Sequence, residues 1–320
     1  MTAPRITTSE QWITAKPKLS VLIPYFKDDP VALMLALDAL PHIAGQVEVI
    51  VYNDGTDDIA LEDTVNAALS TLTLPAMNIT ATVNKGRSAA RNALQDAARA
   101  DWVLFLDADM RPVKDSFLQD YLTLIQSEAD VVFGGFHVEH RAVNADRDLH
   151  RALSQTSDCL SLAERQAAGP QFVATSNLCV RKTALEAEGF DPEFSGWGWE
   201  DSEWAARIAK RFTLRHVDNP ALHLGLETTD TLLSRFRTSG PNYVRFTQKH
   251  PELAQSLALY RIATKLGHIP GQRLLRPLLK VLVKNSILPV SWRVAALKLW
   301  RASWYGEALT RPAPVREVIA

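Results

Sequence analysis

Cysteine is scarce in this chain, which contains only two cysteines among its 320 residues. Cys159 and Cys179 are too far apart for a C-x-x-C pair, so we expect free thiols in a reducing compartment and no disulfide framework. The N-terminal stretch MTAPRITTSEQW has no apolar run of the kind found in signal peptides. No segment approaches about 20 uninterrupted apolar residues, so we expect no transmembrane helix and a cytoplasmic protein.

Two phosphate-binding motifs are also absent. The chain contains neither G-x-x-x-x-G-K-[ST] nor a G-x-G-x-x-G that joins a strand to a helix. Their absence argues against P-loop chemistry and against a dinucleotide cofactor. We expect no nucleic-acid partner.

Acidic residues are missing from one long segment near the C-terminus. Between Arg261 and Arg301 the chain has nine Lys or Arg residues and no Asp or Glu. One interpretation is a helical pair that lies on an anionic membrane, peripheral to its inner face. The other is a helical pair that packs on the rest of the protein and exposes a basic surface. Pro277 and Pro289 exclude one continuous helix.

Short apolar runs alternate with helical segments in the first third of the chain. Alternation of this kind predicts an α/β fold, with a mainly parallel sheet covered by helices on both faces. The predicted strands are residues 19–24, 47–52, 78–83, 102–106, 130–138 and 172–180. The predicted helices are residues 30–40, 85–100, 146–168, 183–188 and 200–211. Residues 215–224 are predicted to be extended, and the chain is expected to be helical from residue 229 onward.

Polar side chains follow four of the predicted strands. They are Asp28, then Asn53-Asp54-Gly55, then Asn84-Lys85-Gly86-Arg87, and then Asp107-Ala108-Asp109. Ligands of parallel sheets bind beyond the carboxyl ends of the strands, so these residues predict a site at that edge.

The segment WVLFLDADM places two carboxylates directly after an apolar strand. If the chain stays extended, Asp107 and Asp109 project the same way. Two such carboxylates suit a hard divalent cation that keeps water and binds substrate phosphates. The alternative is a solvated turn.

Two further strand ends have a functional and an ordinary interpretation. Asp54 is a candidate hydrogen-bond acceptor for a base or ribose, although Asn-Asp-Gly is also a plain turn signal. Lys85, Arg87 and Arg91 surround a predicted helix N-terminus and predict an anion pocket, or only a basic first turn.

The stretch GWGWEDSEW combines tryptophans with carboxylates. Acids at the first turn of a helix are favoured by its dipole, which is a sufficient explanation for Glu200 and Asp201 alone. Trp197 and Trp199, however, offer flat faces to sugar rings, and Asp201 is then a candidate general base toward a sugar hydroxyl. His223, on an extended segment, is a candidate metal ligand, although a lone His is more often structural.

The motifs SVLIPYF, NDG, NKGRSAARN, FLDADM, NLCVRKTALEAEGFDPEFSGWGWED and ALHLG occur in this order between about residues 18 and 225. Together they resemble the family 2 glycosyltransferases, which have a GT-A fold. The segment GFDPEFSGWGWED is also similar to the Gly-Trp-Gly-x-Glu-Asp motif of β-1,4-galactosyltransferases and chondroitin-type polymerases.

This resemblance implies a role for each candidate residue. The nucleotide-sugar donor would be bound by Pro24, Tyr25, Asp54, Lys85, Arg87, Arg91 and Asp107. Mn²⁺ or Mg²⁺ would be held by Asp109 and His223, the acceptor by Trp197, Trp199 and Glu200, and Asp201 would be the catalytic base. The chain departs from the family pattern at Asn53-Asp54-Gly55-Thr56, where Asp-Asp-Gly-Ser is frequent, and at Trp199, where the related motif has Gly.

The resemblance implies a metal-dependent inverting transferase. It would move a hexose or N-acetylhexosamine from a UDP-linked donor to a saccharide or lipid-linked acceptor in surface polysaccharide or glycan synthesis. We expect a GT-A catalytic domain over residues 1–227, with a nucleotide-binding half (18–110) and an acceptor-binding half (111–227), and a basic helical extension over 228–320. The alternatives are a sugar nucleotidyltransferase and a non-catalytic sugar-binding module.

Overall fold

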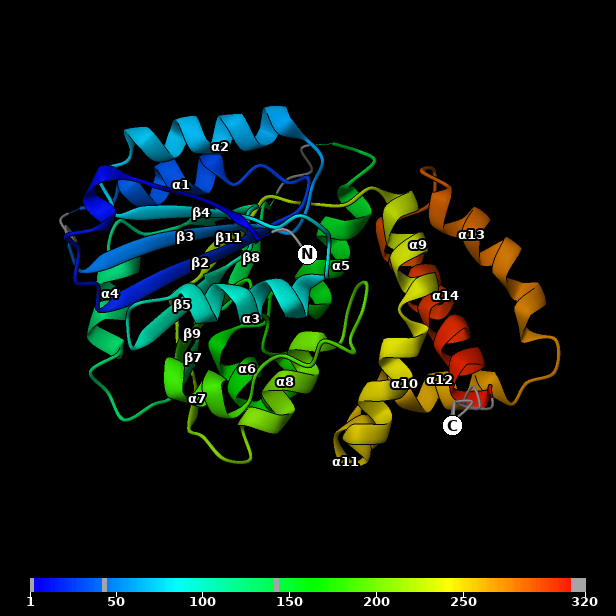
Figure 1. Cartoon of the computed structure of the whole chain (residues 1–320). Coiled ribbons are helices and arrows are strands. Elements are labelled where there is room, and N and C mark those ends of the chain that lie inside the picture. Colours follow the sequence, from blue (N-terminus) through cyan, green and yellow to red (C-terminus); the bar gives the residue numbers. More distant parts are fainter. Residues whose placement is uncertain (1–2, 42–44, 141–143, 312–320) are drawn as a thin grey trace, which may run out of the picture. The chain divides into compact units, whose positions relative to one another are not determined.

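The computed structural model describes residues 3–41, 45–140 and 144–311, which form two compact units (Figure 1). The first unit comprises Met1–Ala142, Ser154–Gly196 and Glu200–Leu226. The second comprises Val143–Leu153, Trp197–Trp199 and Glu227–Ala320. The predicted domain boundary at residues 227 and 228 stays a prediction, and the last residues of the predicted extension, 312–320, lie outside the described part.

The first unit is built on an eight-stranded sheet with the order β1-β4-β3-β2-β5-β9-β7-β10. Strands β2, β3, β4 and β5 are mutually parallel, whereas β9 runs antiparallel to both β5 and β7. The strands are β1 (Arg5–Thr8), β2 (Leu19–Tyr25), β3 (Val47–Asn53), β4 (Ala76–Thr80), β5 (Trp102–Leu106), β7 (Val131–Phe133), β9 (Asn177–Arg181) and β10 (Leu214–His216). A second sheet has the order β6 (Met110–Pro112), β11 (Ala221–His223) and β8 (Phe136–Val138).

Helices cover both faces of the large sheet because its central strands carry apolar side chains on both faces. Val21 and Val49 face one core together with α1 (Val31–Asp38), α2 (Ile59–Thr71) and α4 (Phe117–Leu124). Leu22 and Ile50, one residue further along each strand, face the other core. That core contains α3 (Arg87–Ala97), α7 (Lys182–Ala187) and α8 (Glu200–Ile208), and Figure 1 shows α1 and α2 on the opposite face from α3. Two further helices precede β9 in the chain, α5 (Asp148–Ser157) and α6 (Leu162–Ala168).

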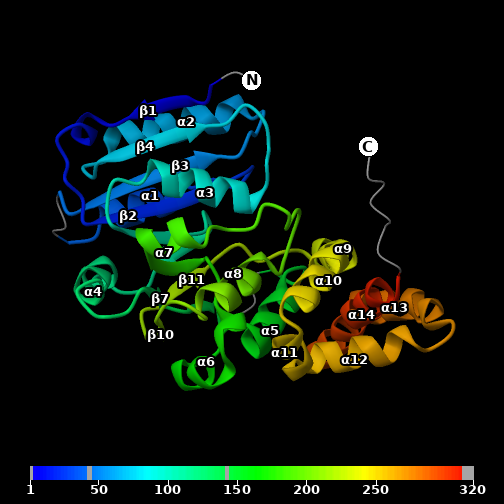
Figure 2. The same ribbon diagram turned by 60° about the horizontal axis from the view of Figure 1, so that its bottom comes forward.

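Most of the second unit is helical. Its helices are α9 (Thr229–Thr238), α10 (Gly240–Lys249), α11 (Pro251–Ser256), α12 (Ala258–Gly267), α13 (Arg276–Lys284) and α14 (Val290–Thr310), with the 3-10 turn η3 (Gln272–Leu275) before α13. Helix α14 packs along α12 and α13 (Figure 2). Gly267 and Gly306 allow close approach, because a Cβ on Gly267 would lie 2.6 Å from the Gly306 carbonyl oxygen. Among the described residues, none of the helices is both long and apolar enough to span a bilayer.

The predicted α/β class with a mainly parallel sheet and a C-terminal helical region is confirmed, and several boundaries differ. The strand predicted over 130–138 is interrupted at Gly134 and Gly135, so that β7 and β8 belong to different sheets. A Cβ on Gly134 would lie 2.3 Å from the Tyr121 hydroxyl oxygen, and Gly135 has a φ of +80°. The strand predicted over 172–180 begins only at Asn177, after a 3-10 turn over Pro170–Phe172. Strand β1 and helices α2 and α4 were not predicted.

Candidate active site

The candidate residues gather at one edge of the large sheet because β2, β3 and β5 are parallel and paired in register. Their carboxyl ends are Tyr25, Asn53 and Leu106, and Asp54 and Asp107 come directly after two of them. The predicted position of the site, beyond the carboxyl ends of parallel strands, therefore agrees with the topology.

Asp54 connects two loops at this edge. Its backbone N–H donates to the Tyr25 carbonyl oxygen, and its two carboxylate oxygens accept the backbone N–H groups of Lys85 (2.9 Å) and Gly86 (2.8 Å). Burial raises the pKa of Asp54 even though these two amides and the Lys85 charge act to lower it. Gly55 is required next to it, because its φ is +75° and a Cβ would lie 2.3 Å from the Val83 carbonyl carbon. Asp54 thus fixes the loop that precedes α3.

The other predicted donor residues differ in exposure. The Tyr25 side chain is buried in the core, and its hydroxyl donates to Asn78 Oδ1 (3.3 Å), whereas Pro24 is half-buried. Lys85 and Arg87 are exposed where the loop enters α3. Of this group, Pro24, Lys85 and Arg87 present side chains to solvent at the edge of the sheet.

Arg91 is the centre of the site's charge network. Its side chain is only 2% exposed, and its Nη1 donates to Asp201 Oδ1 at 3.0 Å. The same Nη1 lies 3.5 Å from Glu200 Oε1, and Nη2 lies 3.6 Å from Asp107 Oδ1. Burial alone lowers the pKa of Arg91, but the three carboxylates outweigh it and raise that pKa. One buried guanidinium therefore holds three acids that come from two distant parts of the chain.

Thr175 is a site residue that the sequence did not reveal. Its backbone N–H donates to Asp201 Oδ2 (3.1 Å), and its hydroxyl donates to Asp201 Oδ1 (3.0 Å). The residue is 1% exposed and precedes β9 in a segment that was predicted to be strand. Together with Arg91, Thr175 fixes the Asp201 carboxylate, and Oδ2 keeps the capacity to accept another hydrogen bond.

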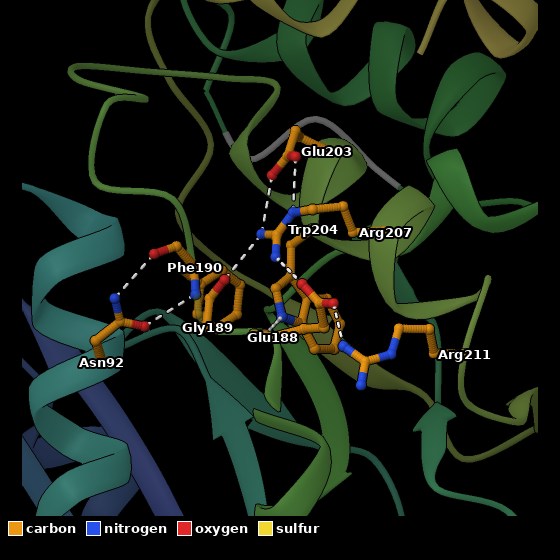
Figure 3. Close-up of polar contacts among 8 residues, drawn as sticks. All are labelled: Asn92, Glu188, Gly189, Phe190, Glu203, Trp204, Arg207 and Arg211. Carbon is orange, nitrogen blue, oxygen red and sulfur yellow. Dashed lines mark hydrogen bonds and ion pairs between the residues drawn. The ribbon is translucent and has the colours of Figure 1, made fainter. Parts of the chain in front are cut away.

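Polar and aromatic contacts through residues 188–190 connect α8 to α3 (Figure 3). Asn92, next to Arg91 on α3, accepts from the Phe190 N–H (3.0 Å) and donates to the Phe190 carbonyl oxygen (2.9 Å). The Phe190 ring stacks on Trp204, whose Nε1 donates to the Glu188 carbonyl oxygen. Arg207 adds hydrogen bonds to Glu188, Gly189 and Glu203. This network positions α8, and with it Glu200 and Asp201.

Asp109 and His223 are brought together by the second sheet, where Met110 on β6 pairs with His223 on β11. His223 Nε2 lies 3.3 Å from Asp109 Oδ2, while Asp109 Oδ1 is buried without a hydrogen-bond partner in the described structure. Burial would raise the pKa of Asp109, but His223 reverses this and lowers it. Burial likewise lowers the pKa of His223, and the neighbouring Asp109 charge raises it above its ordinary value. Gly225 must lack a side chain, because a Cβ there would lie 1.7 Å from Asp109 Oδ2.

These two residues fit a divalent cation. A carboxylate oxygen without a partner beside an imidazole nitrogen gives two protein ligands, and Mg²⁺ or Mn²⁺ at phosphate sites takes the rest from water and substrate. In the described residues, no cluster of three or more potential metal ligands occurs.

The two aspartates of the DxD sequence do not project together as an extended chain would require. Strand β5 ends at Leu106, and the chain then turns, with the Met110 N–H donating to the Asp107 carbonyl oxygen (3.0 Å). Asp107 consequently faces Arg91 and Asp109 faces His223. The two carboxylates therefore have different partners.

Trp197 and Trp199 belong to the second unit. The Trp199 ring lies 4.7 Å from the Tyr243 ring and 4.8 Å from the Phe246 ring, and its Nε1 donates to the Tyr305 hydroxyl oxygen (3.1 Å). Trp197 packs edge-on against Phe236. Both rings are only partly exposed, so a large part of each contributes to the packing of the second unit.

Comparisons with known proteins agree with this architecture. A family model described as Glycosyl transferase family 2 matches residues 20–186, which is more than half of the chain. The structure resembles the mannosyltransferase PcManGT from Pyrobaculum calidifontis in complex with GDP-Man and Mn²⁺, at 16% identity and a TM-score of 0.56, covering 91% of this chain and 87% of that one. It also resembles residues 1–349 of S. aureus TarS in complex with UDP-GlcNAc, at 14% identity and a TM-score of 0.52, covering 91% and 90%. No curated protein matches the sequence.

These similarities confirm the predicted GT-A fold. The Gly-Trp-Gly-x-Glu-Asp resemblance lies beyond residue 186 and stays a prediction.

Proposed function

The chain belongs to glycosyl transferase family 2 and is therefore a glycosyltransferase, and we propose that it transfers a hexose or N-acetylhexosamine from a nucleotide sugar with inversion at the anomeric carbon. The carrying observation is the Arg91 cluster, which places Asp107, Glu200 and Asp201 around one buried cation at the edge of the sheet. The family match favours this activity over a sugar nucleotidyltransferase or a non-catalytic sugar-binding module.

The nucleotide is proposed to bind at the ends of β2 and β3. Asp54 contributes by fixing the loop that carries Lys85 and Arg87, because both of its oxygens already accept backbone N–H groups. Asp107 is 36% exposed and has one oxygen directed to Arg91, so its other oxygen is available to a ribose hydroxyl. We propose UDP as the nucleotide, and this choice rests on the family resemblance alone.

Mn²⁺ or Mg²⁺ is proposed to be held by Asp109 and His223. When bound there, the metal supplies Lewis-acid neutralisation of the diphosphate charge. Exposed Lys85 and Arg87 add positive charge for the same phosphates.

Asp201 is proposed as the general base. Its side chain is 24% exposed, compared with 6% for Glu200, so Asp201 is the more accessible of the two carboxylates. Asp201 takes the proton of an acceptor hydroxyl while that oxygen attacks the anomeric carbon, and the bond to the nucleoside diphosphate breaks with its electron pair leaving on the diphosphate. Glu200, held by Arg91 and Arg87, is proposed to orient the acceptor.

The acceptor is proposed to be a saccharide or a lipid-linked glycan in surface polysaccharide or glycan synthesis in the cytoplasm. Trp197 and Trp199 remain proposed acceptor residues, and their packing limits the ring surface that a sugar can contact. Because the Trp199 ring is engaged by Tyr243 and Phe246, any sugar contact would use the part of the ring that stays exposed.

The test is nucleoside diphosphate release from a panel of UDP, GDP and dTDP sugars, measured with Mn²⁺, with Mg²⁺ and with EDTA. We expect release from one donor that depends on the metal and is lost in Asp109→Ala. If no donor is turned over, calorimetry with UDP and GDP plus Mn²⁺ separates a missing acceptor from a missing donor site, since absence of all binding contradicts the proposal. The anomeric configuration of the product, measured by NMR, tests inversion directly.

A further inference from the structure

Two helices of the second unit expose an unusual amount of apolar surface. The exposed fractions are 83% for Leu274, 57% for Leu278 and 63% for Val281, which belong to η3 and α13. Trp292 on α14 is 71% exposed, and Ile287, between the two helices, is 91% exposed. A scattered exposed Leu needs no explanation, but several large side chains on neighbouring helices do.

Two of these side chains, Leu278 and Trp292, line grooves that are connected. A groove of about 400 Å³ is lined by Leu279, Leu282, Trp292 and Leu299, together with small residues of α14. A second groove of about 240 Å³ is lined by Leu275, Leu278, Leu279 and Leu299, among others. Because the two grooves share Leu279 and Leu299, they are one feature. We call it the apolar face, defined by Leu275, Leu278, Leu279, Leu282, Trp292 and Leu299.

Only part of this face packs in the second unit: Leu279 and Leu282 are half-buried against its core, whereas Leu278 and Trp292 stay exposed. Helix α13 is attached through its other side, where Val283 is fully buried and Arg276 donates to the Ser303 hydroxyl and carbonyl oxygens. Helix α14 likewise buries Leu297 and Trp300 in the core. Exposed Leu278 and Trp292 therefore lie opposite the side that fixes each helix.

Positive charge lies on the same two helices as the apolar face. Lys280 on α13 and Lys298 on α14 are exposed, and neither forms an ion pair with any residue in the part of the chain that the structure describes. Lys284 pairs with Asp230, and Arg273 pairs with the buried Glu307. The segment from Arg261 to Arg301 contributes no carboxylate at all.

We propose that the apolar face docks on the surface of an anionic lipid bilayer. Leucine and tryptophan side chains enter the boundary between headgroups and acyl chains, and the basic residues of the same acid-free segment attract anionic headgroups. A tryptophan suits this depth because its ring is apolar and its N–H is polar. A second copy of the chain fits less well, since it would bring Lys280 and Lys298 against the same uncompensated charges.

The inference does not depend on the transfer reaction. It gives the protein a location at which a lipid-linked acceptor is concentrated, whatever sugar is moved. The alternative, in which the basic helices only pack on the protein, leaves the exposure of Leu278 and Trp292 without a role.

Vesicle flotation of the full chain tests the proposal. Vesicles of phosphatidylcholine are compared with vesicles in which about a third of the lipid is phosphatidylglycerol, at low and at high salt. We expect binding to the anionic vesicles at low salt, and at least a tenfold loss of binding in Lys280→Glu/Lys298→Glu and in Leu278→Ser/Trp292→Ser. Matched changes elsewhere, Ile13→Ser/Lys210→Glu, are expected to leave binding unchanged, since Ile13 is 84% exposed and Lys210 is exposed but both lie in the first unit.

A second measurement fixes the orientation on the bilayer. Brominated lipids should quench part of the tryptophan fluorescence, and Trp292→Phe should remove that quenching while the protein still floats with the vesicles. Binding that is equal on neutral and anionic vesicles, or equal in all variants, would overturn the proposal. So would a chain that ignores vesicles and forms a dimer in solution that Leu278→Ser/Trp292→Ser dissociates, because the face would then be an interface between copies.

Discussion

The two units contain ion clusters with opposite ratios of charge. In the first unit one guanidinium, Arg91, faces the carboxylates of Asp107, Glu200 and Asp201. In the second unit one buried carboxylate, Glu307, faces the guanidinium groups of Arg273, Arg276 and Arg311. Both clusters have an ion that is almost inaccessible to water at the centre, and in both at least one partner comes from a distant segment.

The two clusters differ in the sign of the excess charge: it is negative around Arg91 and positive around Glu307. The surplus of carboxylates around Arg91 leaves a group that can accept a proton, which is the role proposed for Asp201. The guanidinium groups around Glu307 connect the end of α14 to the start of α13. Two of them, Arg273 and Arg276, belong to the acid-free segment 261–301. The same kind of ion pairing therefore surrounds the proposed active site in one unit and joins two helices in the other.

The largest effect is expected when the central ion of the first cluster is removed. Arg91→Met leaves three carboxylates without their shared cation, so we expect the free energy of unfolding to fall by about 3–5 kcal/mol, together with loss of turnover. Urea unfolding measures the first quantity. Arg87→Met is the matched control, because Arg87 is 44% exposed and lies 3.7 Å from Glu200, and its loss should change stability by about 0.5 kcal/mol or less. Equal effects of the two changes would contradict the central role of Arg91.

The second prediction concerns the proposed base, Asp201, replaced by a side chain of the same size that cannot accept the proton. Asp201→Asn keeps one oxygen that accepts from Arg91 and the Thr175 hydroxyl but loses the bond from the Thr175 N–H, so we expect stability to fall by about 1–2 kcal/mol, donor binding to be kept and turnover to fall about 10²- to 10⁴-fold. Diphosphate release and calorimetry with the donor measure the two parts. Asp96→Asn, a change at an exposed position on α3, serves as the control. If Asp201→Asn kept most of its turnover, another group would be the base.

Changing the central ion of the second cluster should affect stability alone. Glu307→Gln should cost about 2 kcal/mol, less than a fully buried pair because Arg273 and Arg311 are largely exposed. Although burial acts to raise the pKa of Glu307, Arg276 and its neighbours lower it.

The lowered pKa gives the sign of the pH dependence. A carboxyl whose folded pKa is below its unfolded value contributes stability at neutral pH, and this contribution is lost as pH falls below about 4.5 and through the folded pKa. The difference in unfolding free energy between the wild type and Glu307→Gln should therefore shrink in acid. A difference that grows as pH falls would contradict the assignment.

The smallest change concerns one hydroxyl group. Thr175→Val removes the bond to Asp201 Oδ1 and keeps the backbone bond to Oδ2, so we expect kcat to fall about tenfold with an unchanged donor KM. Thr175→Ser restores the hydroxyl and should recover most of kcat. If Ser and Val behave alike, Thr175 acts through packing instead of positioning the carboxylate.

The sequence was informative wherever local pattern decides structure. Residues 102–106 were predicted as a strand and form β5 with the same bounds, because an apolar run flanked by polar residues leaves little choice. The break at Gly134 was missed, since it follows from the distant Tyr121 hydroxyl, which occupies the space of a Cβ.

The sequence predicted which residues belong to the candidate site, but it did not predict which of them contact each other. Arg91 and the acids Asp107 and Asp201 were selected from motifs, but their joining around one buried cation is a tertiary fact. Thr175 carried no signal, because a threonine before a strand is ordinary. Asp54 was selected for its side chain, and the oxygens of that side chain turned out to bind the Lys85 and Gly86 amides.

The contact between Arg91 and Asp201 joins residues that are 110 positions apart in the chain. During synthesis on the ribosome, β2 to β5 emerge well before α8. Arg91 and Asp107 are therefore made before their partners Glu200 and Asp201. Closing so long a loop is entropically costly and slow, and the guanidinium stays hydrated until it happens. A fragment that stops before α8 would contain every strand of the proposed nucleotide pocket and still lack two of the three acids that neutralise Arg91. Dissecting this enzyme into a minimal donor-binding piece should therefore fail at that arginine.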